Sequence, residues 1–187
     1  MTRSLIFGGA RSGKSALAER LAAQSGKEVV YIATARGGQG DDEMALRIAQ
    51  HRRQRPAVWR TVEEPLDLAA MLTRHCAPER LVLIDCLTLW LSNLMFSERA
   101  DFPDVGAITL PAQFHQRRAA FLDALARATG DVVLVSNEVG MGIVPYGAIS
   151  RSFTDEAGQL NQAVAALCER AVLVAAGLPL ILKGPPC

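Results

Sequence analysis

The sequence lacks an excess of charge of either sign. Its 187 residues hold 20 Lys and Arg against 19 Asp and Glu, which leaves a formal net charge of +1. Because binding to nucleic acid or to an anionic membrane surface depends on a field of positive charge, we expect neither partner. The sequence also contains no apolar run of about 20 residues, the length that a membrane-spanning helix needs, and this predicts no membrane span.

Cysteine is scarce, and its spacing excludes two further classes of protein. The four cysteines show no C-x-x-C spacing and no clustering with the three histidines, so neither a zinc site nor a disulfide framework is indicated. Such a chain suits the reducing cytoplasm. With an apolar content of 50%, residues 1–187 can bury one substantial core, and the length predicts a single domain.

The most informative stretch present is a glycine-rich loop near the start of the chain. It reads Gly8-Gly9-Ala10-Arg11-Ser12-Gly13-Lys14-Ser15 and matches G-x-x-x-x-G-K-S/T, the pattern that wraps nucleotide phosphates. The apolar run 5–7 before it predicts a buried strand, and residues 15–24 after it predict a helix, which is the context that the motif requires. Lys14 is then expected to reach the β- and γ-phosphates, and Ser15 to offer its hydroxyl to Mg²⁺. A chance glycine-rich turn is the alternative.

A second motif, which ends in an acidic residue, accompanies this loop. Residues 81–85 form a continuous apolar run that ends in Asp85, the pattern of a buried parallel strand whose last carboxylate faces the nucleotide. This is typical of a Walker B element, which holds Mg²⁺ or its water shell opposite Ser15. Whether Asp85 contacts the metal directly, the nucleotide or only an intervening water stays open.

Two further strand ends carry candidate contacts. A predicted strand over 28–33 ends in Thr34, Ala35 and Arg36 and then a glycine-rich stretch, where ligand groups commonly lie in open α/β sheets. Residues 58–62 alternate like a short strand and lead to Glu63. That carboxylate is either a nucleotide or metal contact or the cap of the next helix.

A helix is expected from Asp41 or Asp42 to about Arg55, and it carries His51 on a stripe with apolar residues. One interpretation is a half-buried histidine at the margin of the core. The other is a nucleophile, because Arg47 and Arg55 at four-residue spacing favour a neutral imidazole and could hold phosphates.

The second half of the chain predicts helices over 87–95 and 112–128 and a strand over 131–136. The strand runs into the loop 137–145, which offers two glycines and an apolar surface. Ser152, with Asp155 three residues on, predicts the start of the last long helix. Gly158 inside that helix suggests a close approach by a ligand or another subunit, and residues 171–175 and 180–183 predict an antiparallel pair of strands.

Taken together, these motifs resemble the bifunctional adenosylcobinamide kinase/adenosylcobinamide-phosphate guanylyltransferases of cobalamin biosynthesis. The resemblance spans nearly the whole chain. It rests on the phosphate loop, on Y-I-A-T at 31–34, on D-D-E-M and R-I-A-Q-H-R-R-Q-R-P with W-R-T-V-E between 41 and 63, on N-E-V-G-M-G-I-V-P at 137–145 and on R-S-F-T-D-E-A-G-Q-L-N at 151–161.

The resemblance implies two reactions. In the first, ATP or GTP phosphorylates the aminopropanol hydroxyl of adenosylcobinamide. In the second, His51 attacks the α-phosphorus of GTP to give a guanylyl-enzyme, whose GMP passes to the substrate phosphate. The nucleotide positions that carry over are Gly8 to Ser15, Thr34 to Arg36, Arg52, Arg53, Gln54, Arg55, Glu63 and Asp85. A homotrimer is implied, with the large corrinoid in a cleft bounded by the loop 137–145.

We therefore expect an α/β fold of the P-loop, RecA-like type: a mostly parallel sheet with helices on both faces and a short antiparallel edge at the C-terminus. Two rival functions stay open at this point. One is a P-loop small-molecule kinase without guanylyltransferase activity, in which His51 only packs. The other is a RecA-like NTPase that acts on a macromolecular partner.

Overall fold

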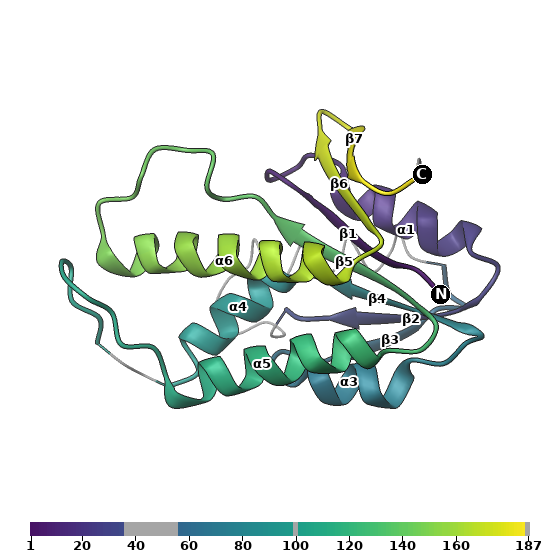
Figure 1. Ribbon diagram of the computed structural model, residues 1–187, viewed down its shortest axis with the longest axis horizontal. Helices are drawn as coiled ribbons and strands as arrows, with labels where there is room; N and C mark the ends of the chain where they lie inside the picture. The colour runs from purple at the N-terminus through teal and green to yellow at the C-terminus, as the bar shows by residue number, and fades with distance from the viewer. Residues whose placement is uncertain (36–55, 99–100, 186–187) are drawn as a thin grey trace.

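The computed structural model describes residues 1–35, 56–98 and 101–185, and Figure 1 shows their arrangement. The strands are β1 (Arg3–Gly8), β2 (Glu28–Ala33), β3 (Arg60–Glu63), β4 (Arg80–Asp85), β5 (Asp131–Asn137), β6 (Arg170–Ala175) and β7 (Leu178–Lys183). The helices are α1 (Lys14–Gln24), α3 (Leu68–His75), α4 (Leu87–Met95), α5 (Ala112–Arg127) and α6 (Ala148–Leu167).

These strands form one seven-stranded sheet in the order β3-β2-β4-β5-β1-β6-β7. All neighbours pair in parallel except β6 and β7, which are antiparallel. The central strands are apolar runs because helices cover both of their faces, as parallel sheets require. The carboxyl ends of β1, β2, β4 and β5 consequently meet at one edge of the sheet, and this edge carries most of the motifs predicted to bind nucleotide.

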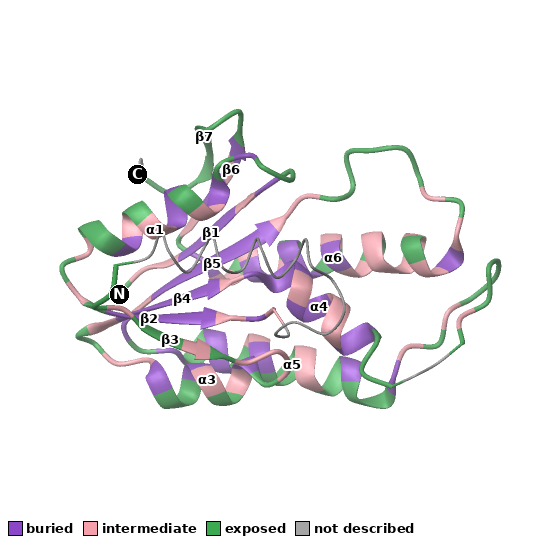
Figure 2. Ribbon diagram, turned by 180° about the vertical axis from the view of Figure 1, so that it is seen from behind, coloured by how far each residue is buried: buried purple, intermediate pink, exposed green. Residues whose placement is uncertain are grey.

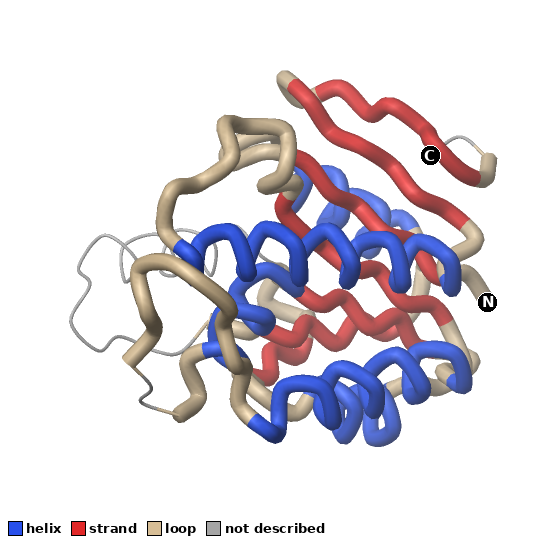
Figure 3. The backbone as a smooth tube through the Cα atoms, turned by 60° about the vertical axis from the view of Figure 1, so that its left-hand side comes forward, coloured by secondary structure: helices blue, strands red, loops and turns tan. Residues whose placement is uncertain are grey.

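Alternate residues of each central strand enter two separate cores. On one face, residues of α1 such as Leu17 and Ala18 pack with Ile6 and Tyr31. On the other face, α3, α4, α5 and α6 cover the intervening strand residues, and Trp90 of α4 is fully buried there. Figure 3 shows helices on both sides of the sheet. The fold predicted from the sequence, including the antiparallel C-terminal edge, is confirmed.

Two element boundaries were predicted wrongly. The third strand begins at Arg60 rather than Val58, because Pro56 starts a turn in which the Trp59 N–H donates to the Pro56 carbonyl at 3.0 Å, and Val58 is 91% exposed. The last long helix begins at Ala148 rather than Ser152, with Gly147 as its N-cap and no side-chain cap. The Ser152 pattern therefore lies inside the helix and caps nothing.

Two segments with exposed apolar side chains lie among the described residues, and Figure 2 colours most of both as exposed. One is β7, all six of whose residues are exposed, including Leu178, Leu180 and Leu182. The other is the loop between β5 and α6, whose exposed apolar side chains are Val139, Met141, Ile143, Val144 and Tyr146. No helix within residues 1–35, 56–98 and 101–185 combines the length and the apolar character needed to cross a membrane.

Arg3 ties the start of the sheet to two other elements. Its guanidinium forms an ion pair with Glu169, just before β6, at 2.6 Å, and donates to the carbonyl of Ala126 at the end of α5 at 3.1 Å. The hydrogen bond from Arg3 lowers the pKa of the Glu169 carboxyl from 4.5 to about 2. A carboxyl whose pKa is depressed in the folded state stabilises the fold above its unfolded pKa, and this contribution is lost as the pH falls toward 2.

We expect Glu169→Gln to lower the thermal unfolding midpoint at pH 7 and to have a much smaller effect near pH 2, where the pH has reached the folded-state pKa of the Glu169 carboxyl and most of its contribution is lost. Melting curves at pH 7, 4 and 2 measure this difference. The matched control is Asp123→Asn, because Asp123 pairs with Arg127 where both side chains are more than half exposed, and such pairs contribute little. An equal effect of the two substitutions at pH 7 would contradict the prediction.

Candidate nucleotide site

The phosphate loop occupies the position that the sequence predicts, between the carboxyl end of β1 and the start of α1. Its backbone is held in left-handed conformations at Arg11, with φ 55°, and at Gly13, with φ 95°. The loop ends directly at the N-terminus of α1, whose free N–H groups and positive dipole end attract anions. Strand, loop and helix thus form an anion-binding cradle, and the alternative of a chance glycine-rich turn is not supported.

Lys14 is nearly buried at the first position of α1, and its ammonium group points back along the loop to donate to the Gly9 carbonyl at 3.0 Å. Burial lowers the pKa of Lys14, while the nearby Cys86 and Asp85 act in the opposite direction. The electrostatic influence of Asp85 on Lys14 places the end of β4 beside the loop. Ser12 contributes a buried hydroxyl that has no hydrogen-bond partner among the described residues and is available to a ligand.

Asp85 ends β4, as predicted, and lies at the surface of the same edge of the sheet. Its Oδ2 accepts a hydrogen bond from the Tyr31 hydroxyl at 3.0 Å, and this bond orients the carboxylate. Mg²⁺ in nucleotide sites takes one or two protein oxygens, with phosphates and waters completing its shell. The hydroxyl of Ser15 and the carboxylate of Asp85 fit that requirement. Within the described part of the chain, no group of three or more His, Cys, Asp or Glu side chains is arranged to hold a metal alone.

Thr34 has a structural role that the sequence did not indicate. Its side chain is fully buried, and its Oγ1 donates to the Cys86 carbonyl and accepts from the Cys86 N–H, both at 2.8 Å. The Thr34 hydroxyl therefore ties the ends of β2 and β4 together, with Ala35 following it at the edge of the sheet. The remaining predicted residues of this region, Arg36, His51, Arg52, Arg53, Gln54 and Arg55, lie outside the described residues.

Glu63 ends β3 at the same edge of the sheet and is exposed, which leaves its predicted contact with nucleotide or metal as a prediction. The alternative, that Glu63 caps the next helix, is wrong. Asp67 is the N-cap of α3 and accepts a hydrogen bond from the Ala70 N–H, and Glu64 accepts from the N–H groups of Leu66 and Asp67.

A polar cluster beside the loop was missed by sequence reasoning. The peptide groups around Asn137, at the end of β5, are held from two sides: its N–H donates to Thr88 Oγ1 at 2.7 Å, and its carbonyl accepts from Asn161 Nδ2 at 3.1 Å. The next N–H, that of Glu138, donates to the Gly8 carbonyl at 3.1 Å. Asn161 is 8% exposed, and its Oδ1 has no partner among the described residues. The sequence could have indicated Asn137, because it begins the motif 137–145, but no motif or pattern pointed to Thr88.

Helix α6 also holds the far end of the exposed loop 138–147. Arg151 Nη1 donates to the carbonyls of Pro145 and Tyr146. The apolar tip of the loop thus projects between two polar attachments, at Asn161 and Arg151. A surface held in this way can bind a large ligand without first having to become ordered.

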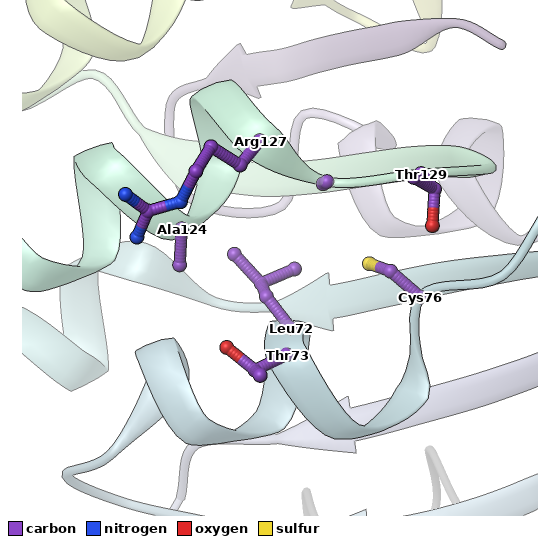
Figure 4. A pocket seen from close by; sticks show the side chains of 7 residues that line it. Leu72, Thr73, Cys76, Ala124, Arg127 and Thr129 are labelled. Carbon is purple, nitrogen blue, oxygen red and sulfur yellow. The ribbon is translucent and has the colours of Figure 1, made fainter.

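A pocket of about 230 Å³ lies away from these groups, between the ends of α3 and α5 (Figure 4). Its lining residues include Leu72, Cys76 and Ala128. Because α3 precedes β4 and α5 precedes β5, the pocket adjoins the amino ends of the strands, at the edge of the sheet opposite the phosphate loop. Burial raises the pKa of the Cys76 thiol to about 11, which disfavours its reactive thiolate form.

The sheet order, the loop at the end of β1 and the carboxylate at the end of β4 define a P-loop nucleotide-binding protein of the RecA-like class. Among solved structures, an ATPase of the type III secretion system of pathogenic bacteria matches 96% of this chain and 56% of its own, with a TM-score of 0.57 and 12% identity. The assembled ATPase EscN of enteropathogenic Escherichia coli matches 94% of this chain and 43% of its own, with a TM-score of 0.52 and 15% identity. These likenesses show the fold alone.

Within this class, the chain belongs to the cobinamide kinase / cobinamide phosphate guanyltransferase family, whose model matches residues 4–182. The bifunctional adenosylcobalamin biosynthesis protein CobP of Pseudomonas aeruginosa is 53% identical over 184 residues, which cover 98% of this chain and 99% of that protein. Its counterpart CobU of Escherichia coli K12 is 41% identical over 181 residues, or 96% and 98% of the two chains. The resemblance noted from the sequence is confirmed, and the two activities are those of a bifunctional enzyme of adenosylcobalamin biosynthesis.

Proposed function

We propose that this enzyme performs both transfers around the one phosphate loop and that His51 is the nucleophile of the second. The observation that carries the proposal is the cradle formed by β1, residues 8–15 and α1, in a chain matched over residues 4–182 by a family with both activities. In the first transfer, adenosylcobinamide takes the γ-phosphoryl group of ATP or GTP. Lys14 and the N–H groups of the loop bear the charge that develops on the phosphate oxygens.

In the second transfer, an imidazole nitrogen of His51 bonds to the α-phosphorus of GTP as the bond to the β-phosphate oxygen breaks and pyrophosphate leaves. A phosphate oxygen of adenosylcobinamide phosphate then attacks the same phosphorus, the N–P bond breaks, and the imidazole departs. Dividing one displacement into two is the usual advantage of a covalent intermediate. Arg36, Arg52, Arg53 and Arg55 supply positive charge for the triphosphate. Ser15 and Asp85 would hold Mg²⁺, which would neutralise phosphate charge.

A label experiment tests the guanylyl-enzyme directly. The protein is incubated with GTP labelled at the α-phosphorus and Mg²⁺, denatured, and then exposed separately to acid and to base. A phosphoramidate is expected to survive base and to be cleaved by acid. The parallel sample with γ-labelled GTP serves as the control and should retain nothing. Absence of an acid-labile, base-stable label from the α-labelled sample would leave the simpler kinase mechanism as the better account.

The corrinoid is proposed to lie against the exposed apolar tip of the loop 138–147. This loop continues from β5, and its first residue, Glu138, donates its N–H to the Gly8 carbonyl, so the start of the loop lies beside the phosphate loop. A corrinoid presents methyl groups and ring edges that suit the side chains of Met141, Ile143 and Val144, which are 75% to 98% exposed.

Ile143→Ser is therefore expected to raise the KM for adenosylcobinamide several-fold while leaving the KM for GTP and the melting temperature unchanged. The physical reason is that Ile143 is 98% exposed and supports no part of the core. Steady-state kinase kinetics with each substrate varied in turn measure the effect. Val58→Ser, at another fully exposed apolar residue far from this loop in the sequence, is the control. Equal KM values for adenosylcobinamide in the two variants would show that the loop is not part of the corrinoid site.

We further propose that the chain acts as a homotrimer. The support on this chain is the apolar edge strand β7, because an exposed edge strand of this kind commonly pairs with or packs on another chain. The open surface at Gly158, where an added Cβ would meet no described atom within 4 Å, is a second place where a neighbouring subunit could approach. Light scattering of the purified protein measures the mass of the assembly.

A further inference from the structure

The turn between β6 and β7 lies directly against the phosphate loop, although the two are far apart in the sequence (Figure 1). The Gly177 N–H donates to the Ser12 carbonyl at 2.8 Å. A Cβ added to Gly13 would lie 3.1 Å from the Gly177 Cα, and one added to Gly8 would lie 2.2 Å from the Val174 carbonyl oxygen. The hairpin therefore contacts both ends of the phosphate loop, at Gly8 and at Gly13.

The geometry of this turn fixes the donor independently of any nucleotide. Ala176 and Gly177 have φ angles of 51° and 78°, the combination found in two-residue hairpin turns whose twist matches that of the flanking strands. Strand pairing continues up to the turn, with Ala175 opposite Leu178. In addition, β6 is itself paired with β1, the strand that leads into the phosphate loop. The Gly177 N–H is consequently held by the sheet.

The Ser12 carbonyl and the Gly13 N–H belong to one peptide group, and in a trans peptide these two bonds point in opposite directions. A carbonyl held toward the hairpin turns the Gly13 N–H away from it, toward the cradle at the N-terminus of α1. We propose that Gly177 is a positioning residue for phosphate binding: its N–H orients the Ser12–Gly13 peptide so that the Gly13 N–H faces the nucleotide phosphates.

This orientation matters because the peptide group between Ser12 and Gly13 could otherwise rotate. Gly13 adopts a φ of 95°, and a glycine peptide can turn over at little steric cost. A turned peptide would present the Ser12 carbonyl oxygen to the phosphates instead of an N–H, which replaces an attraction by a repulsion. Holding the donor in place before the nucleotide arrives removes that loss from the binding free energy.

The test replaces the backbone N–H of Gly177 by an ester oxygen and leaves every side chain unchanged. Cys168 makes this feasible, because a recombinant 1–167 thioester can be ligated to a synthetic peptide 168–187 that carries the ester, and the full chain is then refolded. The matched control is an ester at Leu178, which weakens the same hairpin but keeps the Gly177 N–H. Both chains are compared with an all-amide chain made by the same ligation.

We expect the Gly177 ester to raise the dissociation constant for GTP and for GDP by about 5- to 20-fold, the range for one lost hydrogen bond and a misdirected donor. The KM for GTP should rise with it, while the kcat of the kinase reaction changes less. The melting temperature should match that of the Leu178 ester. The recombinant variant Gly177→Asn, whose Cβ meets open space and whose side chain tolerates a left-handed φ better than alanine does, keeps the N–H and should bind GTP almost normally.

Two outcomes would overturn the inference: GTP binding by the Gly177 ester as tight as by the all-amide chain, or equal weakening by the Leu178 ester. The inference rests on the phosphate loop as the nucleotide site. The two can fail separately: if the phosphate loop were not the nucleotide site, the all-amide chain itself would not bind GTP there. The inference is independent of whether His51 becomes guanylylated.

Discussion

Replacing His51 by Asn is expected to abolish guanylyl transfer while the enzyme continues to phosphorylate adenosylcobinamide. Asparagine keeps a polar side chain of similar reach but has no nucleophilic nitrogen, so no guanylyl-enzyme can form. We expect the rate of GMP transfer to fall by at least about 10³-fold, the scale seen when a nucleophile is removed from an enzyme. In the proposed mechanism the γ-phosphoryl transfer does not use the imidazole, so this reaction should proceed near its usual rate.

The measurement separates the two products. Adenosylcobinamide phosphate and adenosylcobinamide-GDP are resolved by chromatography after incubation with GTP, and the α-label retained by the denatured protein is counted in the same samples. Replacement of a second histidine, His115→Asn, is the control, because His115 lies on α5, outside the candidate nucleotide site. The assignment would be wrong if His51→Asn retained the label, or if both products disappeared together while GTP binding persisted.

Replacing Lys14 by Met is expected to impair both reactions. Methionine preserves the length and the packing of the nearly buried side chain but removes the only charge that the phosphate loop itself places inside its cradle. We expect kcat/KM of the kinase reaction to fall by about 10²- to 10³-fold, as for the loss of one preorganised group that stabilises transition-state charge. Guanylyl transfer should fall as well, because the triphosphate is no longer anchored for attack at its α-phosphorus.

Burial also predicts how Lys14→Met affects stability. The folded environment lowers the pKa of Lys14, so its charged form is less favoured in the apo fold than in water. Removing that charge should therefore leave the melting temperature of the apo protein unchanged or raise it slightly, while the rise in melting temperature caused by GTP is lost. A variant that melted lower without nucleotide and still gained stability from GTP would contradict this account. Arg20→Met, which removes an exposed charge of α1 outside the loop, is the control.

The combination of His51→Asn and Lys14→Met distinguishes the functions that the sequence left open. A kinase without guanylyltransferase activity would lose activity only in the Lys14 variant, and the bifunctional enzyme responds to each substitution differently. An NTPase acting on a macromolecule would show hydrolysis stimulated by that partner and no transfer to a corrinoid. The family to which the chain belongs supports the bifunctional outcome.

Much of the nucleotide edge could be predicted because its signals are local in the sequence. The strand, the loop 8–15 and the helix that begins at Lys14 are consecutive, and the apolar run ending in Asp85 is self-contained. The start of α6 was predicted wrongly because the prediction also relied on local signals. Ser152 and Asp155 match a helix-start pattern, whereas Gly147, the residue that actually precedes the helix, gives no stronger signal in the sequence. Local preference alone did not decide between them.

The parts that could not be predicted are contacts between distant backbone groups. Nothing in the composition around Gly177 indicates that its N–H meets the Ser12 carbonyl, because the bond depends on the pairing of β6 with β1. Thr34 shows the converse. Its position at a strand end suggested a ligand contact, yet its hydroxyl forms two bonds to the Cys86 peptide that only the assembled sheet explains. In both cases the backbone, which every sequence shares, supplies the partner.

The position of β1 in the sheet also has a consequence for the synthesis of this protein. The first strand to be made lies between β5 and β6, two of the last three, so its pairing spans most of the chain. Contacts at such sequence separation form late, because a long loop must close before they repay its entropy. A nascent chain therefore carries its phosphate loop in an unfinished sheet until β6 has emerged, and during that interval β1 has an unpaired edge that is open to mispairing.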